Sequence, residues 1–373
     1  MPAIMELIGA RWARHVARAL GIVVIGLGAT AGSAQAVTKM FWGPTTGLNG
    51  QSAFPIYKQL GVDLFQTQLD WRAVAPTRPA NPTDPADPAY QWPASLDQAM
   101  ADAKSHGIGV ALMVIRTPGW ANGGRDWEWA PENPKDYADF LRAAAKRYPS
   151  VRVWMVWGEP SFNTKFQPSG AQTSFRSTRL SAAAKRGPRT YAQLLDGAYA
   201  ALKAANRRNL VVGGMTAVTG DIRPENWVRN MRLPNGKAPR MDMYGHNPFS
   251  ARRPNLRNRP SPQQAVDFSD LGRFQKVVDR RLAKPRGKRT LRLYLSEFTI
   301  PTAPDSEFNF RTTPATQASW IRSAFRVARQ VRAYGLGWIH LYDGDLVNSG
   351  SMGGLLTADG QKKPGFTAFQ RAR

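Results

Sequence analysis

Apolar residues recur along the chain in two alternating patterns after residue 37. Short continuous runs of β-branched, aliphatic and aromatic residues are typical of buried strands. Longer segments have an apolar residue at every third or fourth position, which is typical of half-buried helices. Tyr137, Phe140, Leu141 and Ala144 have this helical spacing. The two patterns alternate eight times, so the sequence predicts eight strand–helix units.

The predicted strands lie near residues 38–43, 62–70, 108–115, 151–158, 210–216, 241–246, 291–297 and 336–342. The predicted helices lie near residues 51–60, 94–106, 134–147, 190–206, 224–232, 270–283, 314–334 and 364–371. This order predicts an α/β fold, a single-domain (β/α)₈ TIM barrel. An open, doubly wound sheet is the structural alternative. It usually has a glycine-rich phosphate-binding turn after its first strand, which residues 43–47 do not form.

Three of the predicted strands are followed by long loops. Residues 72–93 are rich in proline, and residues 163–189 are polar and basic. The third loop, residues 247–269, contains the arginines Arg252, Arg253, Arg257 and Arg259. In a (β/α)₈ barrel the loops after the strands lie at the carboxyl end, where active sites are found. We therefore expect these loops to flank a cleft.

Two of the predicted strands are followed by a glutamate. The run over residues 151–157 leads to Glu159 and then to Pro160, which cannot continue a strand because it has no N–H. The run over residues 291–295 leads in the same way to Glu297. Two carboxyl groups at the ends of buried strands supply what acid/base and nucleophilic chemistry on a sugar requires. The sequence therefore predicts these two glutamates as a catalytic pair.

The composition points to an anionic partner. The chain has 51 lysines and arginines against 26 aspartates and glutamates, a net charge of +25. Nucleic-acid binding is one hypothesis, but the arginines are scattered and no nucleic-acid motif accompanies them. An anionic glycan or wall polymer fits a basic rim better. Twelve tryptophans weakly favour carbohydrate, because sugar rings stack on indole faces. There is no cysteine, which excludes disulfides and thiolate chemistry.

The first residues have the pattern of a signal peptide. Arg11, Arg14 and Arg18 precede an apolar run over residues 19–28, and residues 34–36 form a small-x-small cleavage site. We expect residues 1–36 to be removed after Ala36 and the protein to be secreted. A retained N-terminal anchor is the alternative. Residues 37–373 would then form the catalytic domain.

Seven short motifs in order resemble one group of enzymes. They are Leu69–Trp71, Tyr90–Trp92, Thr117–Ala121, Trp157–Pro160, Tyr244–Phe249, Ser296–Phe298 and Gly354–Leu356. The chain resembles glycoside hydrolase clan A, the retaining TIM-barrel glycosidases, and is most similar to the cellulase-like and β-xylosidase/α-L-iduronidase families. The likeness covers nearly all of residues 38–372.

The resemblance implies a role for each glutamate. Glu159 would act as general acid and then as general base, and Glu297 would attack the anomeric carbon in a double displacement on an oligo- or polysaccharide. Retention requires the two carboxyl groups to lie about 5–5.5 Å apart. We expect no cofactor, no catalytic metal and no nucleic-acid partner. We also expect no membrane contact of the mature chain, and a monomer.

Several polar and aromatic residues are candidates for binding the sugar. They are Trp71, Trp120, Asn163, Tyr244, His246, Asn247, Trp338 and Gln68. Trp71 and Trp120 end strands and are expected to be better sugar platforms than Trp127 or Trp129 in the following loop. Trp338 would form the floor under the reacting sugar if its face of the strand is inward. Burial in the core is the alternative for both Trp338 and His246.

Two positions depart from the pattern of the family. Gly158 stands where an asparagine usually binds the 2-hydroxyl, and Gln66 stands where an arginine usually lies near the nucleophile. Glycine leaves room beside Glu159, so we expect a sugar with an unusual or substituted 2-position. Asn163, Asn247 or Gln68 could replace the missing amide. The second hypothesis is a pseudo-enzyme that binds carbohydrate without cleaving it.

Overall fold

The computed structural model describes residues 36–283, 290–344 and 350–372. Its strands are β1 (Thr38–Trp42), β2 (Leu64–Asp70), β3 (Gly109–Ile115), β4 (Val153–Val156), β5 (Leu210–Ala217), β6 (Met243–Asn247), β7 (Arg292–Leu295) and β8 (Gly335–Trp338). Each strand pairs in parallel with the next, and β1 pairs with β8, so the sheet closes into a barrel. The predicted (β/α)₈ fold is confirmed.

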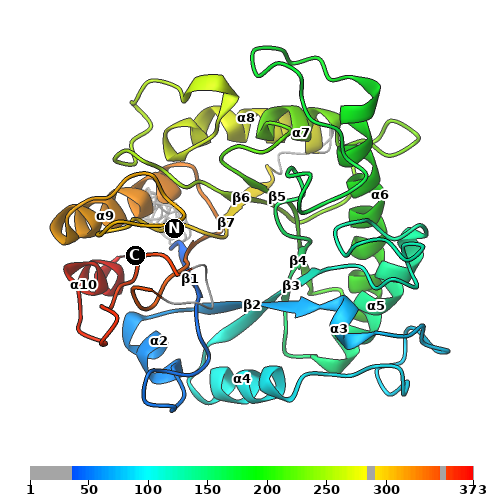
Figure 1. The fold of residues 1–373 in the computed structure, drawn as a ribbon, viewed down its shortest axis with the longest axis horizontal. Coiled ribbons are helices and arrows are strands. Elements are labelled where there is room, and N and C mark those ends of the chain that lie inside the picture. The colour runs from blue at the N-terminus through cyan, green and yellow to red at the C-terminus, as the bar shows by residue number, and fades with distance from the viewer. Residues whose placement is uncertain (1–35, 284–289, 345–349, 373) are drawn as a thin grey trace, which may run out of the picture. The chain divides into compact units, whose positions relative to one another are not determined.

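Helices surround the barrel, as Figure 1 shows in a view along its axis. They are α2 (Phe54–Leu60), α3 (Trp71–Val74), α4 (Ala94–Ser105), α5 (Pro134–Arg147), α6 (Ala182–Ala205), α7 (Pro224–Asn230), α8 (Leu271–Leu282), α9 (Pro314–Gln330) and α10 (Pro364–Arg371), with 3-10 turns η1 (Pro262–Gln264) and η2 (Phe268–Asp270). The short helix α3, which the sequence analysis did not predict, follows β2 directly because the Asp70 side chain accepts a hydrogen bond from the Ala73 N–H.

The barrel has separate inner and outer cores. Apolar side chains between the strands and the helices form the outer core. Inside the barrel, the core includes five methionines, Met40, Met113, Met155, Met215 and Met243. Methionine is unbranched and flexible, so it fills the irregular space inside a closed sheet. The interior is therefore packed, and chemistry is confined to the mouth.

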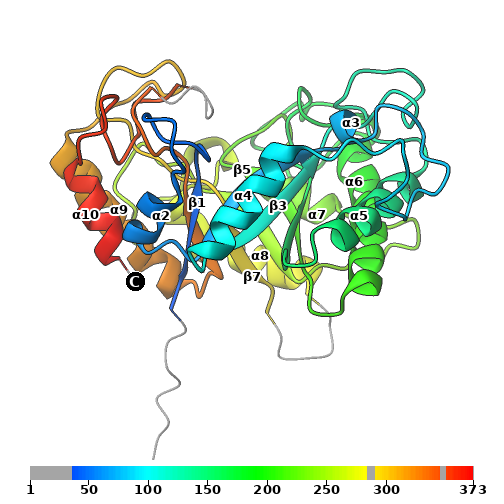
Figure 2. The ribbon, with the colours of Figure 1, turned by 90° about the horizontal axis from the view of Figure 1, so that it is seen from below.

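The loops that follow the strands lie at one end of the barrel, and the chain enters β1 from the other end (Figure 2). The ends of β4, β6 and β7 meet at the first of these ends, because all strands are parallel. Parallel barrels bring residues from distant parts of the chain together at this end. This explains how two glutamates 138 residues apart in the sequence, at positions 159 and 297, come to share a site.

The predicted signal peptide, residues 1–36, lies outside the described residues except for Ala36. Its removal and the secretion of the protein stay predictions. Among the helices of the described part of the chain, none has the length and apolar character needed to cross a membrane.

Candidate active site

Glu159 is held at the end of β4 by an unusual backbone conformation. Trp157 and Glu159 have positive φ angles, 65° and 43°. Such angles are uncommon for residues other than glycine and cluster at functional sites. The Trp157 indole N–H donates to the Lys165 carbonyl oxygen at 2.7 Å, which closes the loop after the strand. The backbone at Glu159 therefore departs from the strand conformation directly after β4.

Glu297 follows a segment fixed by three buried side chains. The Trp42 indole donates to the Ser296 hydroxyl at 3.1 Å, and the Gln66 amide donates to the Ser296 carbonyl oxygen at 3.0 Å. Gln66 in turn accepts a hydrogen bond of 2.6 Å from the Tyr294 hydroxyl. Gln66 therefore positions the backbone next to Glu297, which differs from the direct role of the arginine that the family pattern has there.

Asn247 joins the two glutamates. It lies at the end of β6, is fully buried, and its amide donates to Glu159 Oε1 at 3.0 Å. The same side chain forms a hydrogen bond with Glu297 that lowers the pKa of that carboxyl group. Its own carbonyl oxygen has no protein partner among the described residues. One buried amide thus holds together carboxyl groups from the loop after β4 and from the loop after β7.

Glu297 binds its proton unusually tightly. Burial raises its pKa, and the neighbouring Glu159 raises it further, to about 8. Glu307, in the loop after β7, contributes a third negative charge in the same direction, whereas Lys165 opposes it. At neutral pH the proton therefore resides on Glu297, and the sequence analysis had expected it on Glu159.

Lys165 is the cation of this site, and sequence reasoning did not find it. Its ammonium group forms an ion pair with Glu159 Oε2. Burial alone would lower the pKa of Lys165, but the Glu159 carboxylate outweighs burial and the pKa is raised. Glu297 and Glu307 also interact with it. Three carboxyl groups and one ammonium group therefore share the barrel mouth.

The raised pKa of Glu297 predicts that Glu297→Gln stabilises the fold at high pH. The carboxyl group titrates near 4.5 when unfolded and near 8 when folded, so the wild type loses stability as pH rises from about 4.5 to about 8. Glutamine does not titrate. Denaturation should show a variant more stable by about 2–4 kcal/mol at pH 9, and no difference below pH 4. Equal stability at pH 9 would contradict the pKa assignment.

The two tryptophans expected as sugar platforms are not exposed rings. Trp71 is fully buried and stacks on Phe140 in the outer core. Trp120 is half-buried, its indole donates to the Ala75 carbonyl oxygen at 2.8 Å, and the Arg78 guanidinium covers its ring. The prediction for Trp71 is wrong, because β2 ends by turning this side chain outward against α5. Because Arg78 covers one face of the Trp120 ring, a sugar cannot stack on that face.

Three further candidates belong to the core. Tyr244 is fully buried against Phe274. His246 is also buried, and its ring nitrogens contact Thr216 Oγ1 at 3.0 Å and the Val266 carbonyl oxygen at 2.9 Å. Burial lowers the pKa of His246 to about 4, so the ring is neutral. Neither side chain can contact a sugar, and the predictions for both are wrong.

Trp338 does not form the floor of the site. It packs in the outer core edge-on to Phe298. The neighbouring Gly337 faces inward instead, since a Cβ there would lie 1.9 Å from the Ser296 carbonyl oxygen. The face of β8 that carries Trp338 therefore points outward. The alternative that Trp338 is a residue of the core is correct.

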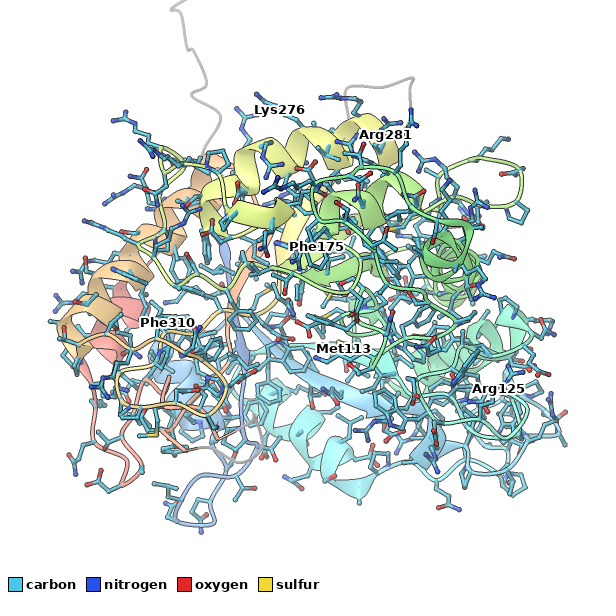
Figure 3. The ribbon with its side chains drawn as sticks, turned by 45° about the horizontal axis from the view of Figure 1, so that its top comes forward. Met113, Arg125, Phe175, Lys276, Arg281 and Phe310 are labelled. Carbon is cyan, nitrogen blue, oxygen red and sulfur yellow. The ribbon has the colours of Figure 1, made fainter. Side chains whose placement is uncertain are left out.

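Gly158 does not leave open space beside Glu159. A Cβ at this position would lie 3.1 Å from the Met113 sulfur and 3.2 Å from its terminal methyl carbon. Figure 3 shows Met113 at the centre of the barrel, far from Arg125 at its periphery. The expectation that glycine makes room for a bulkier sugar is therefore wrong, because Met113 already fills that volume.

Gln68 and Asn163 stay predictions as sugar ligands. Gln68 is exposed on the same face of β2 as the buried Gln66, so it points into the barrel mouth. Asn163 is half-buried, and its backbone N–H donates to Asp221 at 2.7 Å. Neither side chain forms a contact with Glu159 or Glu297 that would settle its role.

Two of the four arginines in the 247–269 loop form contacts within the fold. The Arg252 guanidinium pairs with Asp267 at 2.6 Å and lies 3.8 Å from Asp270. Arg253 donates to the Ser323 hydroxyl on α9 at 3.1 Å. Arg252 and Arg253 are thus engaged within the fold. Arg257 and Arg259 are exposed, and their part in a basic rim for an anionic substrate stays a prediction.

Comparison with known proteins shows what the fold resembles. No protein-family model matches the chain, and no curated protein matches it. A family 39 glycoside hydrolase from the gut symbiont Bacteroides cellulosilyticus superimposes with a TM-score of 0.60 at 15% identity. The match covers 90% of this chain and 63% of that one, so the chain spans less than two thirds of that enzyme.

Two further solved structures give the same picture. A glucosidase from Croceicoccus marinus matches with a TM-score of 0.62 at 14% identity, covering 90% of this chain and 67% of that one. A monomeric beta-xylosidase from Caulobacter crescentus matches with a TM-score of 0.57 at 16% identity, with the same coverages. The resemblance that the sequence motifs indicated therefore holds at the level of the fold, and the chain has the (β/α)₈ barrel of these glycoside hydrolases.

Proposed function

We propose that this protein is a glycoside hydrolase that cleaves O-glycosidic bonds of an oligo- or polysaccharide with retention of configuration. The observation that carries the proposal is the meeting of Glu159 and Glu297 on one buried amide, that of Asn247. Two carboxyl groups whose environments differ are the arrangement that glycoside hydrolysis uses. The shared fold with glycoside hydrolases supports the same reaction.

The proposed reaction has two displacements. In the first, a Glu297 oxygen bonds to the anomeric carbon while the bond to the leaving oxygen breaks, and Glu159 gives its proton to that oxygen. In the second, Glu159 takes a proton from water, and the water oxygen replaces Glu297 at the anomeric carbon. Asn247 would hold both carboxyl groups in line during each displacement.

Before the first displacement, one proton must move from Glu297 to Glu159. Attack needs an ionised Glu297 and a protonated Glu159, whereas the raised pKa of Glu297 puts the proton on the nucleophile. Moving that proton from Glu297 to Glu159 conserves the charge of the site. The same transfer ends the ion pair between Lys165 and a charged Glu159. The Lys165 ammonium group, which interacts with both carboxyl groups, can then stabilise the negative charge on Glu297.

We also infer where the enzyme acts. The basic and apolar pattern of residues 1–36 supports export, and the net charge of +25 supports a polyanionic glycan or wall polymer as substrate. These inferences concern where the protein acts and which substrate it uses. They leave the chemistry of the two glutamates unchanged.

The stereochemistry of the first product tests the mechanism. Incubating the protein with a panel of aryl β-glycosides and plant and bacterial oligosaccharides should give at least one hydrolysed substrate. Proton NMR during the first minutes should show the product with the anomeric configuration of its substrate. An inverted first product would contradict the role of Glu297 as nucleophile. Binding without any hydrolysis would favour the carbohydrate-binding pseudo-enzyme instead.

A further inference from the structure

A cavity on the rim of the barrel mouth has the chemistry of a second sugar site. Its volume is about 470 Å³, and it is lined by Asp70, Arg72, Ala73, Arg116 and Trp127. These residues come from the end of β2, from α3 and from the loop after β3. The volume falls within the range of about 300–1,000 Å³ that small-ligand sites occupy.

The charges in this cavity are only partly neutralised. The Arg116 guanidinium donates to Asp70 Oδ2 at 2.9 Å and remains 45% exposed. The exposed Arg72 forms no ion pair or hydrogen bond through its side chain with any residue that the structure describes. Two guanidinium groups thus face one carboxylate. The excess of positive charge suits an anion, and guanidinium groups bind carboxylates and sulfates through paired N–H donors.

The cavity also has an apolar wall. Trp127 is half-buried, and Arg116 lies over its indole ring with 5.2 Å between the guanidinium carbon and the ring centroid. Arg116 also has a positive φ of 66°, a conformation that is uncommon outside glycine. The strand end is thereby bent so that this side chain meets both Asp70 and Trp127. Arg116 covers one face of the Trp127 ring, as Arg78 covers that of Trp120, so Trp127 contributes an apolar wall. Asp70 and the two arginines supply the polar groups that orient a ligand.

The position of the cavity relates it to the catalytic pair. Gln66, Gln68 and Asp70 occupy the same face of β2, since side chains alternate along a strand. Gln66 contacts Ser296, the neighbour of Glu297, and Asp70 lines the cavity. Gln66 and Asp70 are four positions apart along β2, which puts their Cα atoms roughly 13 Å apart. The cavity therefore lies further along β2 than the contact with Ser296, where it suits a unit next to the sugar that reacts.

We propose that this β2–β3 cavity binds an anionic sugar unit, bearing a carboxylate or a sulfate ester, of the glycan that is cleaved at the glutamate pair. The inference rests on the proposed function, because it assigns the cavity to the substrate of that reaction. It also identifies a source of the selectivity for anionic glycans that the engaged arginines Arg252 and Arg253 do not provide.

Binding to a hydrolysis-deficient form of the full-length protein tests the proposal. Calorimetry on the Glu297→Gln variant would compare hexasaccharides of galacturonate and mannuronate with the same chains after reduction of their carboxyl groups. A sulfated form of the reduced chains distinguishes a general anion site from a carboxylate site. We expect an anionic chain to bind at least tenfold more tightly than its reduced form. Arg72→Ala combined with Arg116→Ala should remove that preference.

A charge-matched control separates the cavity from general electrostatics. Arg152 is exposed and immediately precedes β4, so it lies at the opposite end of the barrel. Arg152→Ala should leave the preference intact. Arg72→Ala alone removes no hydrogen bond or ion pair among the described residues and should weaken anionic binding even if Arg116→Ala perturbs the loop. Equal affinity for charged and reduced chains, or the same loss in Arg152→Ala, would overturn the proposal. A protein that keeps the preference but never hydrolyses a glycan would refute the enzyme function and leave the cavity as a binding site.

Discussion

Replacing Glu297 by glutamine is expected to reduce kcat by a factor on the order of 10⁴ or more, since no other group can form the glycosyl-enzyme. Glutamine keeps the size of the side chain and its bond to Asn247 but cannot attack carbon. Glu159→Gln should behave differently. It should lower kcat about 10²–10⁴-fold for substrates with poor leaving groups, which need a proton donor.

The leaving group separates the two roles. With an aryl glycoside whose phenol leaves without a proton, Glu159→Gln should still release one equivalent of phenol in a burst, and Glu297→Gln should release none. Stopped-flow absorbance measures the burst. Glu132→Gln is the control, because it removes an exposed carboxyl group that pairs with Arg125 in the loop after β3, and it should retain most activity. A burst in Glu297→Gln would mean that the nucleophile has been misassigned.

Asn247→Ala is expected to lower kcat about 10²–10³-fold, the loss seen when one positioned donor is removed from an active site. The amide holds Glu159 at 3.0 Å and also bonds Glu297, where it lowers the pKa. Without it, the pKa of Glu297 should rise further. The acidic limb of the pH profile of kcat/KM, where Glu297 becomes ionised, should therefore move to higher pH.

The shift of the pH profile distinguishes positioning from a general loss of stability. Asn226 is a suitable control, since it is also fully buried and donates to the Ser177 carbonyl oxygen at 3.0 Å, in contact with neither glutamate. Asn226→Ala should lower the unfolding temperature without moving the pH profile. If Asn247→Ala leaves the acidic limb where it was, the amide does not act on Glu297.

Local signals made the helices and strands predictable. Helix α5 has the predicted bounds, because Asn133 caps it, Pro134 starts it and its apolar residues recur with helical spacing. Helix α6 begins at Ala182, where the sequence analysis expected a basic loop until residue 190. Ser181 caps the helix and Pro188 lies inside it. Proline normally interrupts a helix, so the pattern indicated a later start.

The direction of the strand side chains was not predictable in the same way. Strands of a parallel barrel are buried on both faces, so their sequences are nearly continuous apolar runs without alternation. Nothing in such a run shows that Trp338 and Tyr244 face the helices while Gly337 faces the barrel interior. The two glutamates could be found because each follows the end of a strand, where parallel topology alone places a side chain at the mouth.

Contacts between distant segments were beyond local reasoning. Lys165 reaches back to Glu159 only because the loop after β4 folds over its own strand, with Trp157 bonded to the Lys165 carbonyl group. Asn247 meets Glu159 only once the barrel closes. Trp127 lines a cavity because Arg116 bends the end of β3. Each of these depends on backbone geometry that residue type does not encode.

The contact between Met113 and the position of Gly158 couples these two residues. An asparagine at 158 would require the Met113 side chain to shift by a few tenths of an ångström, since its sulfur lies 3.1 Å from where the Cβ would be. A small residue at 113 on its own would leave a void inside the barrel, which costs stability. The two positions touch, so the effect of Gly158→Asn is expected to depend on the residue at 113, and the two substitutions should not be additive.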